Sequence, residues 1–179
     1  MKYRRVYIKG GTYFFTIVTY KRYRIFSTQN SIDLFTDAIR YTAKRMPFTI
    51  VAYVILPDHM HFIWTMLEDS YDYSTRWRLI KSYFTRAWCH DESVSKCASR
   101  QKKGEQDVWQ RRFWEHMIRD ENDLIRHIEY IHYNPVKHAF VNSPIEWESS
   151  SFKQYVRDGL YPTNWGDKDN LWPGEGLME

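Results

Sequence analysis

The sequence predicts an α+β fold, a small antiparallel sheet with helices packed on one face. Strand-like and helix-like segments follow one another in the order β-α-β-β-α-β-α, which is typical of this class. The length of 179 residues suits one domain with a single core, and the 43% apolar content excludes a disordered chain. No internal repeat is visible.

The first strand and the first helix are marked by their side-chain patterns. Thr12–Tyr20 is β-branched and aromatic and follows two glycines, so it predicts a strand. In Ser31–Met46 apolar residues recur at spacings of three and four, which predicts an amphipathic helix with Asn30 or Ser31 as its N-cap. Pro47 ends this helix.

A strand pair and a second helix follow. Phe48–Leu56 is an apolar strand, and Pro57 and Asp58 form the turn after it. His59–Met66 is then the antiparallel partner strand. A helix from about Ser74 to Trp88 carries its own apolar stripe, so it also packs on the sheet.

The last elements come after a polar stretch, His90–Asp107, which we interpret as a loop and not as a second domain. Phe113–Arg119 predicts a fourth strand. A third helix runs from Glu121 to about Tyr133, with Asp120 as its N-cap and an Asn-Pro turn at its end. We expect one domain over residues 1–165, followed by a tail, residues 166–179.

Charge divides the chain in the same way. Residues 166–179 contain four acidic side chains and one basic side chain, which gives this segment a charge of −3. Because the whole chain has a net charge of +4, residues 1–165 carry a charge of +7. A basic body suits a polyanionic partner, and the 18% aromatic content provides rings that could stack on unpaired bases. The acidic tail is either a solvated terminus or a cover that inhibits the basic site.

The cysteine count and the hydropathy of the chain indicate the compartment in which the protein works. Two cysteines are too few for a disulfide framework. No segment approaches the ~20 apolar residues that span a bilayer, and no signal sequence is recognisable. We therefore expect a soluble, cytoplasmic protein without a membrane partner.

His59 and His61 are the first candidate site residues. Alternate side chains of a strand point to the same face, so the two imidazoles lie about 7 Å apart, while Met60 points into the core. Such a pair can chelate one divalent cation. The alternative is a structural pair of half-buried, hydrogen-bonded histidines.

Tyr130 and Asn134 are the second candidate pair. They are four residues apart, so they share one face of the third helix. A phenol and an amide oxygen could then approach one metal-bound phosphate. The alternative is a packed tyrosine followed by an ordinary Asn-Pro turn.

These segments resemble a known family. Leu56-Pro-Asp-His-Met-His61 is similar to the His-hydrophobic-His signature of single-tyrosine HUH transposases. Tyr130-Ile-His-Tyr-Asn-Pro-Val-Lys137 resembles the nucleophile helix of their REP-associated tyrosine transposase (RAYT) branch. Trp109-Gln-Arg-Arg-Phe-Trp-Glu-His116 and Tyr7-Ile-Lys-Gly-Gly-Thr12 resemble the same branch, so the likeness covers most of residues 1–165.

The resemblance implies a ferredoxin-like HUH sandwich and a specific chemistry. His59 and His61 would be metal ligands for Mg²⁺ or Mn²⁺, Tyr130 the nucleophile, and Asn134 the third ligand, in place of the longer Gln that related enzymes often use. The enzyme would cut and rejoin single-stranded DNA at palindromic hairpins, the repetitive extragenic palindromes (REP), through a covalent 5′-phosphotyrosine. It would be a monomer associated with the nucleoid. Tyr133 is the rival nucleophile.

Further residues are candidates for DNA contacts and proton transfer. Basic side chains that flank the predicted strands and helices would neutralise phosphates, so that binding weakens with salt. They are Arg4, Arg5, Lys9, Arg76, Arg78, Lys81, Arg111, Arg112 and Lys137. Glu115 and His116 could assist a proton transfer, although structural hydrogen bonding is the alternative for both.

Two other functions compete with this hypothesis. A non-catalytic module would use the basic and aromatic surface to bind hairpin DNA or structured RNA, and it would form no covalent adduct. A different metal hydrolase would activate water and would tolerate replacement of Tyr130 by phenylalanine.

Overall fold

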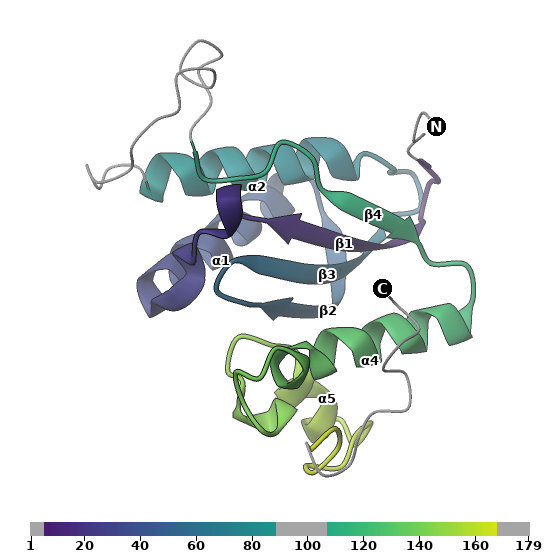
Figure 1. Ribbon diagram of the computed structural model, residues 1–179. Helices are drawn as coiled ribbons and strands as arrows, with labels where there is room; N and C mark the ends of the chain where they lie inside the picture. The colour runs from purple at the N-terminus through teal and green to yellow at the C-terminus, as the bar shows by residue number, and fades with distance from the viewer. Residues whose placement is uncertain (1–5, 89–106, 168–179) are drawn as a thin grey trace.

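The computed structural model describes residues 6–88 and 107–167, which form a four-stranded antiparallel sheet with helices (Figure 1). The strand order is β2-β3-β1-β4. The strands are β1 (Thr12–Val18), β2 (Phe48–Ile55), β3 (His59–Met66) and β4 (Trp114–Met117). The α+β prediction is confirmed, and the predicted bounds of β3 agree with the structure.

Two helices cover one face of the sheet. Helix α1 spans Gln29–Arg45 and helix α2 spans Tyr73–Trp88. Trp64 of β3 stacks on Trp77 of α2 with ring centroids 4.2 Å apart, in the middle of the larger core cluster. Helix α1 begins earlier than predicted because Thr28, and not Asn30 or Ser31, caps it by accepting a hydrogen bond from the Ser31 N–H.

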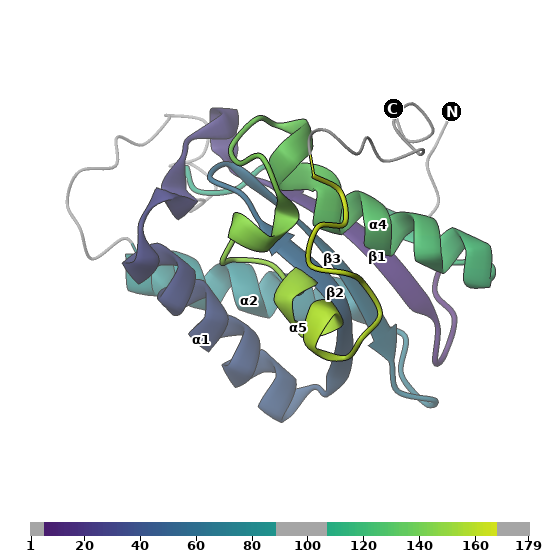
Figure 2. The same cartoon turned by 90° about the horizontal axis from the view of Figure 1, so that it is seen from below.

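Helix α4 (Glu121–Lys137) covers the opposite face, where Ile128 and Ile131 pack with Phe14 and Ile63 in a second core cluster (Figures 1 and 2). The expectation that helices pack on one face only is therefore wrong. The physical reason lies in β3, in which seven of eight positions are buried, so the central strand has no face for solvent.

Helix α4 also continues one turn further than predicted. The expected Asn-Pro turn does not form, because Pro135 lies inside the helix, which ends at Lys137. The Phe140 N–H donates to Pro135 O (3.0 Å) and the Ala139 N–H to Val136 O (2.9 Å), the paired bonds of a Schellman end. Ala139 takes the left-handed conformation (φ 55°) that this end requires.

Short segments close the two ends of this arrangement. The 3₁₀ turns η1 (Tyr20–Arg22) and η2 (Ile25–Ser27) link β1 to α1. After α4, η3 (Pro144–Glu146) leads to α5 (Phe152–Arg157). The stretch between η3 and α5 lies along the free edge of β2, where the Ser151 N–H donates to Tyr53 O (3.0 Å).

Several predicted features fall wholly or largely outside the described ranges. These are Arg4 and Arg5, the loop His90–Asp107 except its last residue, and the acidic tail beyond Asp167. Among the helices that the structure describes, none combines the length and the apolar character needed to cross a membrane.

Candidate metal and tyrosine site

His59 and His61 project from β3 toward α4. Their ring centroids lie 5.3 Å apart with the rings nearly perpendicular, and both side chains are buried. Met60 between them is buried in the opposite core cluster with α1 and α2, as the alternation of the strand predicts.

Each imidazole is held by a hydrogen bond at Nδ1. His59 Nδ1 lies 2.7 Å from Asp58 Oδ1, and His61 Nδ1 lies 2.9 Å from Thr16 Oγ1 on β1. Arg22 Nη1 also lies 3.3 Å from His59 Nδ1, but a nitrogen that donates to Asp58 cannot accept from Arg22, and the Asp58 contact is much shorter. We therefore assign the Nδ1 proton of His59 to the Asp58 bond, which leaves Nε2 with its lone pair.

Burial keeps both rings neutral. It lowers the pKa of His59 below its ordinary value, and it lowers the pKa of His61 well below that value. Asp58 acts in the opposite direction on His59 through its hydrogen bond, although this does not outweigh the burial. Neutral imidazole is the form that ligates a metal ion.

Tyr130 and Asn134 face the histidine pair from α4. The Tyr130 ring centroid lies 5.2 Å from that of His61, and Lys137 Nζ lies 5.3 Å from the Tyr130 centroid. Asn134 acts on His59 in the direction that raises its pKa, so its amide is within reach of that ring. The structure thus brings together the four residues that the sequence singled out.

Three polar atoms of this cluster lack partners within the described ranges. His61 Nε2 and both amide atoms of Asn134 are buried and have no hydrogen bond of normal geometry there. An unpaired buried polar group costs about 1–3 kcal/mol, so native proteins rarely keep one without a ligand or a solvent partner. Two imidazole nitrogens and one amide oxygen are a donor set that fits a divalent cation.

Tyr133, the rival nucleophile, is buried. It packs with Val136, Val141 and Trp165 in a small cluster that also contacts Tyr130. Tyr130 is only half-buried and lies against His61. The geometry therefore favours Tyr130 over Tyr133 as the tyrosine that reaches the histidine pair.

A second group of potential ligands lies at the other end of α4. His116, Asp123 and His127 have ligand atoms within 4.8 Å of one another and could hold a metal ion. Here, however, the polar atoms are paired: His116 Nε2 lies 2.8 Å from Asp123 Oδ2, and His127 Nδ1 lies 2.7 Å from Asp123 O. Neither Asp123 nor His127 was predicted as a site residue, although a spacing of four residues places both side chains on one face of a helix.

Arg76 is not a surface residue, which corrects the expectation that it contacts DNA. Its guanidinium is buried and donates to the carbonyls of Met46 (3.0 Å), Pro47 (3.0 Å) and Asp72 (2.8 Å). Met46 and Pro47 follow the end of α1, where helix carbonyls have no intrahelical partner. Arg76 therefore joins α2 to the end of α1.

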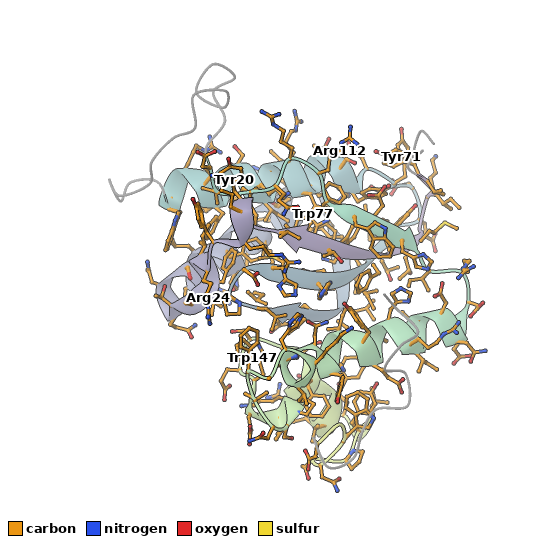
Figure 3. The ribbon with its side chains drawn as sticks, viewed as in Figure 1. Tyr20, Arg24, Tyr71, Trp77, Arg112 and Trp147 are labelled. Atoms are coloured by element: carbon orange, nitrogen blue, oxygen red, sulfur yellow. The ribbon has the colours of Figure 1, made fainter. Side chains whose placement is uncertain are left out.

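The other predicted cations are dispersed. Arg78 and Lys81 belong to α2 and Arg112 lies beside it, on the face of the sheet away from α4 (Figure 3). Arg111, next to Arg112, is exposed, and Lys9 is exposed before the end of β1 that is remote from His59. Of the predicted cations in the described ranges, Lys137 is the one placed beside Tyr130.

The two candidate accessory residues do not join the site either. Glu115 is buried and pairs in register with Phe15, whose side chain belongs to the α1 and α2 core, and Tyr73 Oη lies 3.5 Å from its carboxylate. His116 belongs to the Asp123 group. Both placements match the structural alternative considered for these residues.

Comparison with known proteins identifies the family. No protein-family model matches the sequence. The chain is 42% identical over 179 residues to the REP-associated tyrosine transposase of Escherichia coli (strain K12), covering 99% of this chain and 98% of that protein. It is 43% identical over 169 residues to a Haemophilus influenzae protein of the same family description, covering 94% and 95% of the two chains.

A solved structure agrees with these relatives. A REP-associated tyrosine transposase bound to a REP hairpin superposes with a TM-score of 0.78 at 41% identity, covering 100% of this chain and 99% of that chain. The fold, the paired histidines beside the α4 tyrosine and these full-length matches agree. The chain therefore belongs to the REP-associated tyrosine transposase family.

Proposed function

We propose that this protein is a metal-dependent single-stranded DNA endonuclease and strand transferase that acts on palindromic hairpin DNA through Tyr130. One observation carries the proposal: the Tyr130 ring lies 5.2 Å from that of His61, whose buried Nε2 has no partner in the described ranges. The hairpin-bound relative supports hairpin DNA as the class of substrate.

His59 Nε2, His61 Nε2 and Asn134 Oδ1 would hold the metal ion. Asp58 and Thr16 orient the two imidazoles through Nδ1, as hydrogen-bonding partners of metal-bound histidines commonly do. The cation, Mg²⁺ or Mn²⁺, would polarise the scissile phosphate when bound.

The chain itself supplies the nucleophile and its surroundings. The Tyr130 oxygen attacks the phosphorus in line, a Tyr–O–P bond forms, and the bond between phosphorus and the 3′ oxygen breaks. The proton of the tyrosine hydroxyl is released to solvent, the departing 3′ oxygen takes up a proton from solvent, and the 5′-phosphate stays on the tyrosine. The Lys137 ammonium, 5.3 Å from the Tyr130 ring centroid, places positive charge beside that phosphate.

The reverse attack joins strands. A 3′-hydroxyl attacks the phosphotyrosine, the new phosphodiester forms, and Tyr130 recovers its proton. The phosphotyrosine preserves the energy of the broken phosphodiester, so neither strand joining nor cleavage needs a nucleotide cofactor.

Adduct formation tests the proposal. A hairpin oligonucleotide with single-stranded flanks is incubated with the protein and Mn²⁺, and the adduct is resolved on a denaturing gel and mapped by mass spectrometry. We expect it on Tyr130, and we expect Tyr130→Phe to bind DNA without forming any. Tyr133→Phe is the matched control and should retain the adduct.

Two outcomes would point to the rival functions. An undiminished adduct in Tyr130→Phe would transfer the role to another tyrosine, and metal-dependent cleavage without any adduct would indicate a hydrolase that activates water. Hairpin binding with neither adduct nor cleavage, in the presence or absence of metal, would indicate a non-catalytic module.

A further inference from the structure

A row of aromatic rings leads from the candidate site to the protein surface. The His138 ring centroid lies 5.0 Å from that of His59, Phe140 lies 6.0 Å from His138, and Trp147 lies 5.5 Å from Phe140. The last two contacts are stacked, with interplanar angles of 28° and 27°. We call His138, Phe140 and Trp147 the aromatic strip.

Two arginines accompany the strip from the segment that joins β1 to α1. Arg22 Nη1 lies 3.3 Å from Asp58 Oδ2, beside His59, and its side chain is 57% exposed. The Arg24 guanidinium lies 5.8 Å from the Phe140 ring centroid. Both guanidinium groups are therefore available to a phosphate backbone that runs along the strip.

The backbone on both sides of the strip is held in unusual conformations. The non-glycine residues with positive φ in the described ranges are Lys21 (49°), Arg22 (59°) and Ala139 (55°), and all of them adjoin the strip or its arginines. Residues other than glycine rarely adopt this conformation, because Cβ then lies too close to the following carbonyl oxygen. Thr19 Oγ1 lies within hydrogen-bond distance of Tyr23 O (2.7 Å) and Asp58 O (2.9 Å), so its single proton can be given to either carbonyl and tie the first turn in place. Such strain is typical of segments that position a functional surface.

Exposed rings with neighbouring guanidinium groups match the chemistry of unpaired nucleotides. Bases without a partner strand stack on aromatic side chains, and arginines neutralise the phosphates between them, whereas paired bases hide their faces within the duplex. Phe140 is 36% exposed and His138 is exposed, so bases can reach both rings. The indole Nε1 of Trp147 donates to Ile55 O (3.0 Å), which anchors the outer end of the strip.

We propose that the aromatic strip, with Arg22 and Arg24, is the path of the single-stranded DNA segment that adjoins the phosphate attacked by Tyr130. The assignment rests on the proposed function for the position of that phosphate. It follows from the continuity of the rings with His59, and it names contacts different from the dispersed cations that the sequence suggested.

The chain offers matched controls away from the strip. Tyr71 is an aromatic residue, 49% exposed, that lies well away from Arg24 and Trp147 (Figure 3). Arg40 is an exposed arginine on α1 that pairs with Asp37. Neither residue adjoins His59 in the structure, so Tyr71→Ala and Arg40→Ala remove the same chemistry from other places.

Fluorescence anisotropy with two labelled oligonucleotides tests the proposal. One is a hairpin alone, the other the same hairpin with single-stranded flanks on both sides, and both are titrated with EDTA present so that binding is measured without cleavage. We expect Phe140→Ala to weaken binding of the flanked oligonucleotide roughly 10-fold, the loss of one stacked base, and to leave the bare hairpin unchanged. Phe140→Tyr keeps the ring and should restore the affinity.

Arg24→Ala should also weaken binding of the flanked oligonucleotide alone, and should reduce by about one the number of phosphates that the salt dependence reports. Wild-type affinity of Phe140→Ala for the flanked oligonucleotide, or an equal loss for the bare hairpin, would overturn the proposal. Effects as large in Tyr71→Ala and Arg40→Ala would overturn it too.

The adduct assay separates this proposal from the proposed function. A tyrosine adduct in the wild-type protein without a flank-specific loss in the strip variants would refute the path and leave the chemistry standing. A flank-specific loss without any adduct would support a strand-binding strip and refute the chemistry.

Discussion

A histidine cluster lies at each end of α4, and the two clusters differ in whether their polar atoms have hydrogen-bond partners. At the N-terminal end Asp120 caps the helix, and Asp123 lies between His116 and His127 with its hydrogen bonds satisfied. At the C-terminal end His61 Nε2 and the Asn134 amide are buried without partners in the described ranges. Both clusters have ligand atoms, but one is complete as folded and the other is incomplete.

The two clusters therefore differ in what a bound metal ion would have to displace. Burial opposes ionisation of Asp123, yet the hydrogen bonds from His116 and from the Arg119 N–H outweigh it and lower its pKa to about 2. A metal ion there would have to replace these bonds. At His61 Nε2 and the Asn134 amide a cation would replace no hydrogen bond of normal geometry in the described ranges, so its binding would offset the free-energy cost of burying those groups.

Loss of metal binding should be the largest effect that distinguishes the two clusters. Removing a partner of a metal-bound histidine commonly costs 10–100-fold in affinity, so removing the ligand itself in His61→Ala should weaken Mn²⁺ binding by more than about 100-fold. Isothermal titration with Mn²⁺ measures this. His116→Ala should bind Mn²⁺ as the wild type does, and a loss in His116→Ala with none in His61→Ala would move the metal to the Asp123 group.

The Asp123 cluster should instead control stability. Because the pKa of Asp123 is lowered from 3.8 to about 2 in the fold, its ionised form stabilises the protein by about 2 kcal/mol above pH 4. This contribution is lost as the pH falls from about 4 to about 2. We expect Asp123→Asn to lower the free energy of urea unfolding by that amount at pH 7, and the deficit to shrink at pH 3.

An exposed aspartate provides the control. Asp37 pairs with Arg40 in solvent, so Asp37→Asn should change the unfolding free energy by less than about 0.5 kcal/mol. A deficit for Asp123→Asn that stays constant between pH 7 and pH 3 would argue against an ionised Asp123 as its cause.

Thr16 should show an intermediate effect at the incomplete end. Its hydroxyl orients His61 through Nδ1, so Thr16→Val should weaken Mn²⁺ binding about 10-fold, while Thr16→Ser should retain it. Equal affinity in all three proteins would mean that Thr16 does not set the orientation of the ring.

The smallest effect is expected from the strained end of α4. Ala139 has φ 55°, where glycine is the usual residue, so Ala139→Gly should raise the free energy of unfolding by about 0.5–1 kcal/mol. Thermal unfolding and urea titration measure it. A less stable Ala139→Gly protein would show that the Ala139 methyl group makes a contact worth more than the strain.

Several features could be predicted because they depend on neighbours in sequence. The Pro57-Asp58 turn marked the start of β3, strand geometry gave the common facing of its two histidines, and Asp120 was recognisable as the N-cap of α4. The end of α4 was predicted wrongly, since Pro135 forgoes one hydrogen bond inside the helix and the Schellman end completes the turn beyond it.

Other features depended on contacts that local patterns do not encode. Arg76 has the charge and spacing of a surface cation, but two of its hydrogen-bond acceptors, Met46 O and Pro47 O, lie about 30 residues earlier, just after α1. Asp123 and His127 acquire their role from His116 on another element. Likewise, α4 covers the second face of the sheet because of how the whole chain packs.

By itself, the sequence determined the period of each element and therefore which side chains share a face, because backbone geometry sets these relations over a few residues. Only the tertiary structure decided which polar atoms found partners. It satisfied Asp123, left His61 Nε2 and the Asn134 side-chain amide without partners in the described ranges, and set Phe140 and Arg24 on a path from His59. Hydrogen bonds and stacking are short-ranged in space, and chain separation does not limit them, so the assembled fold alone settles which atoms they join.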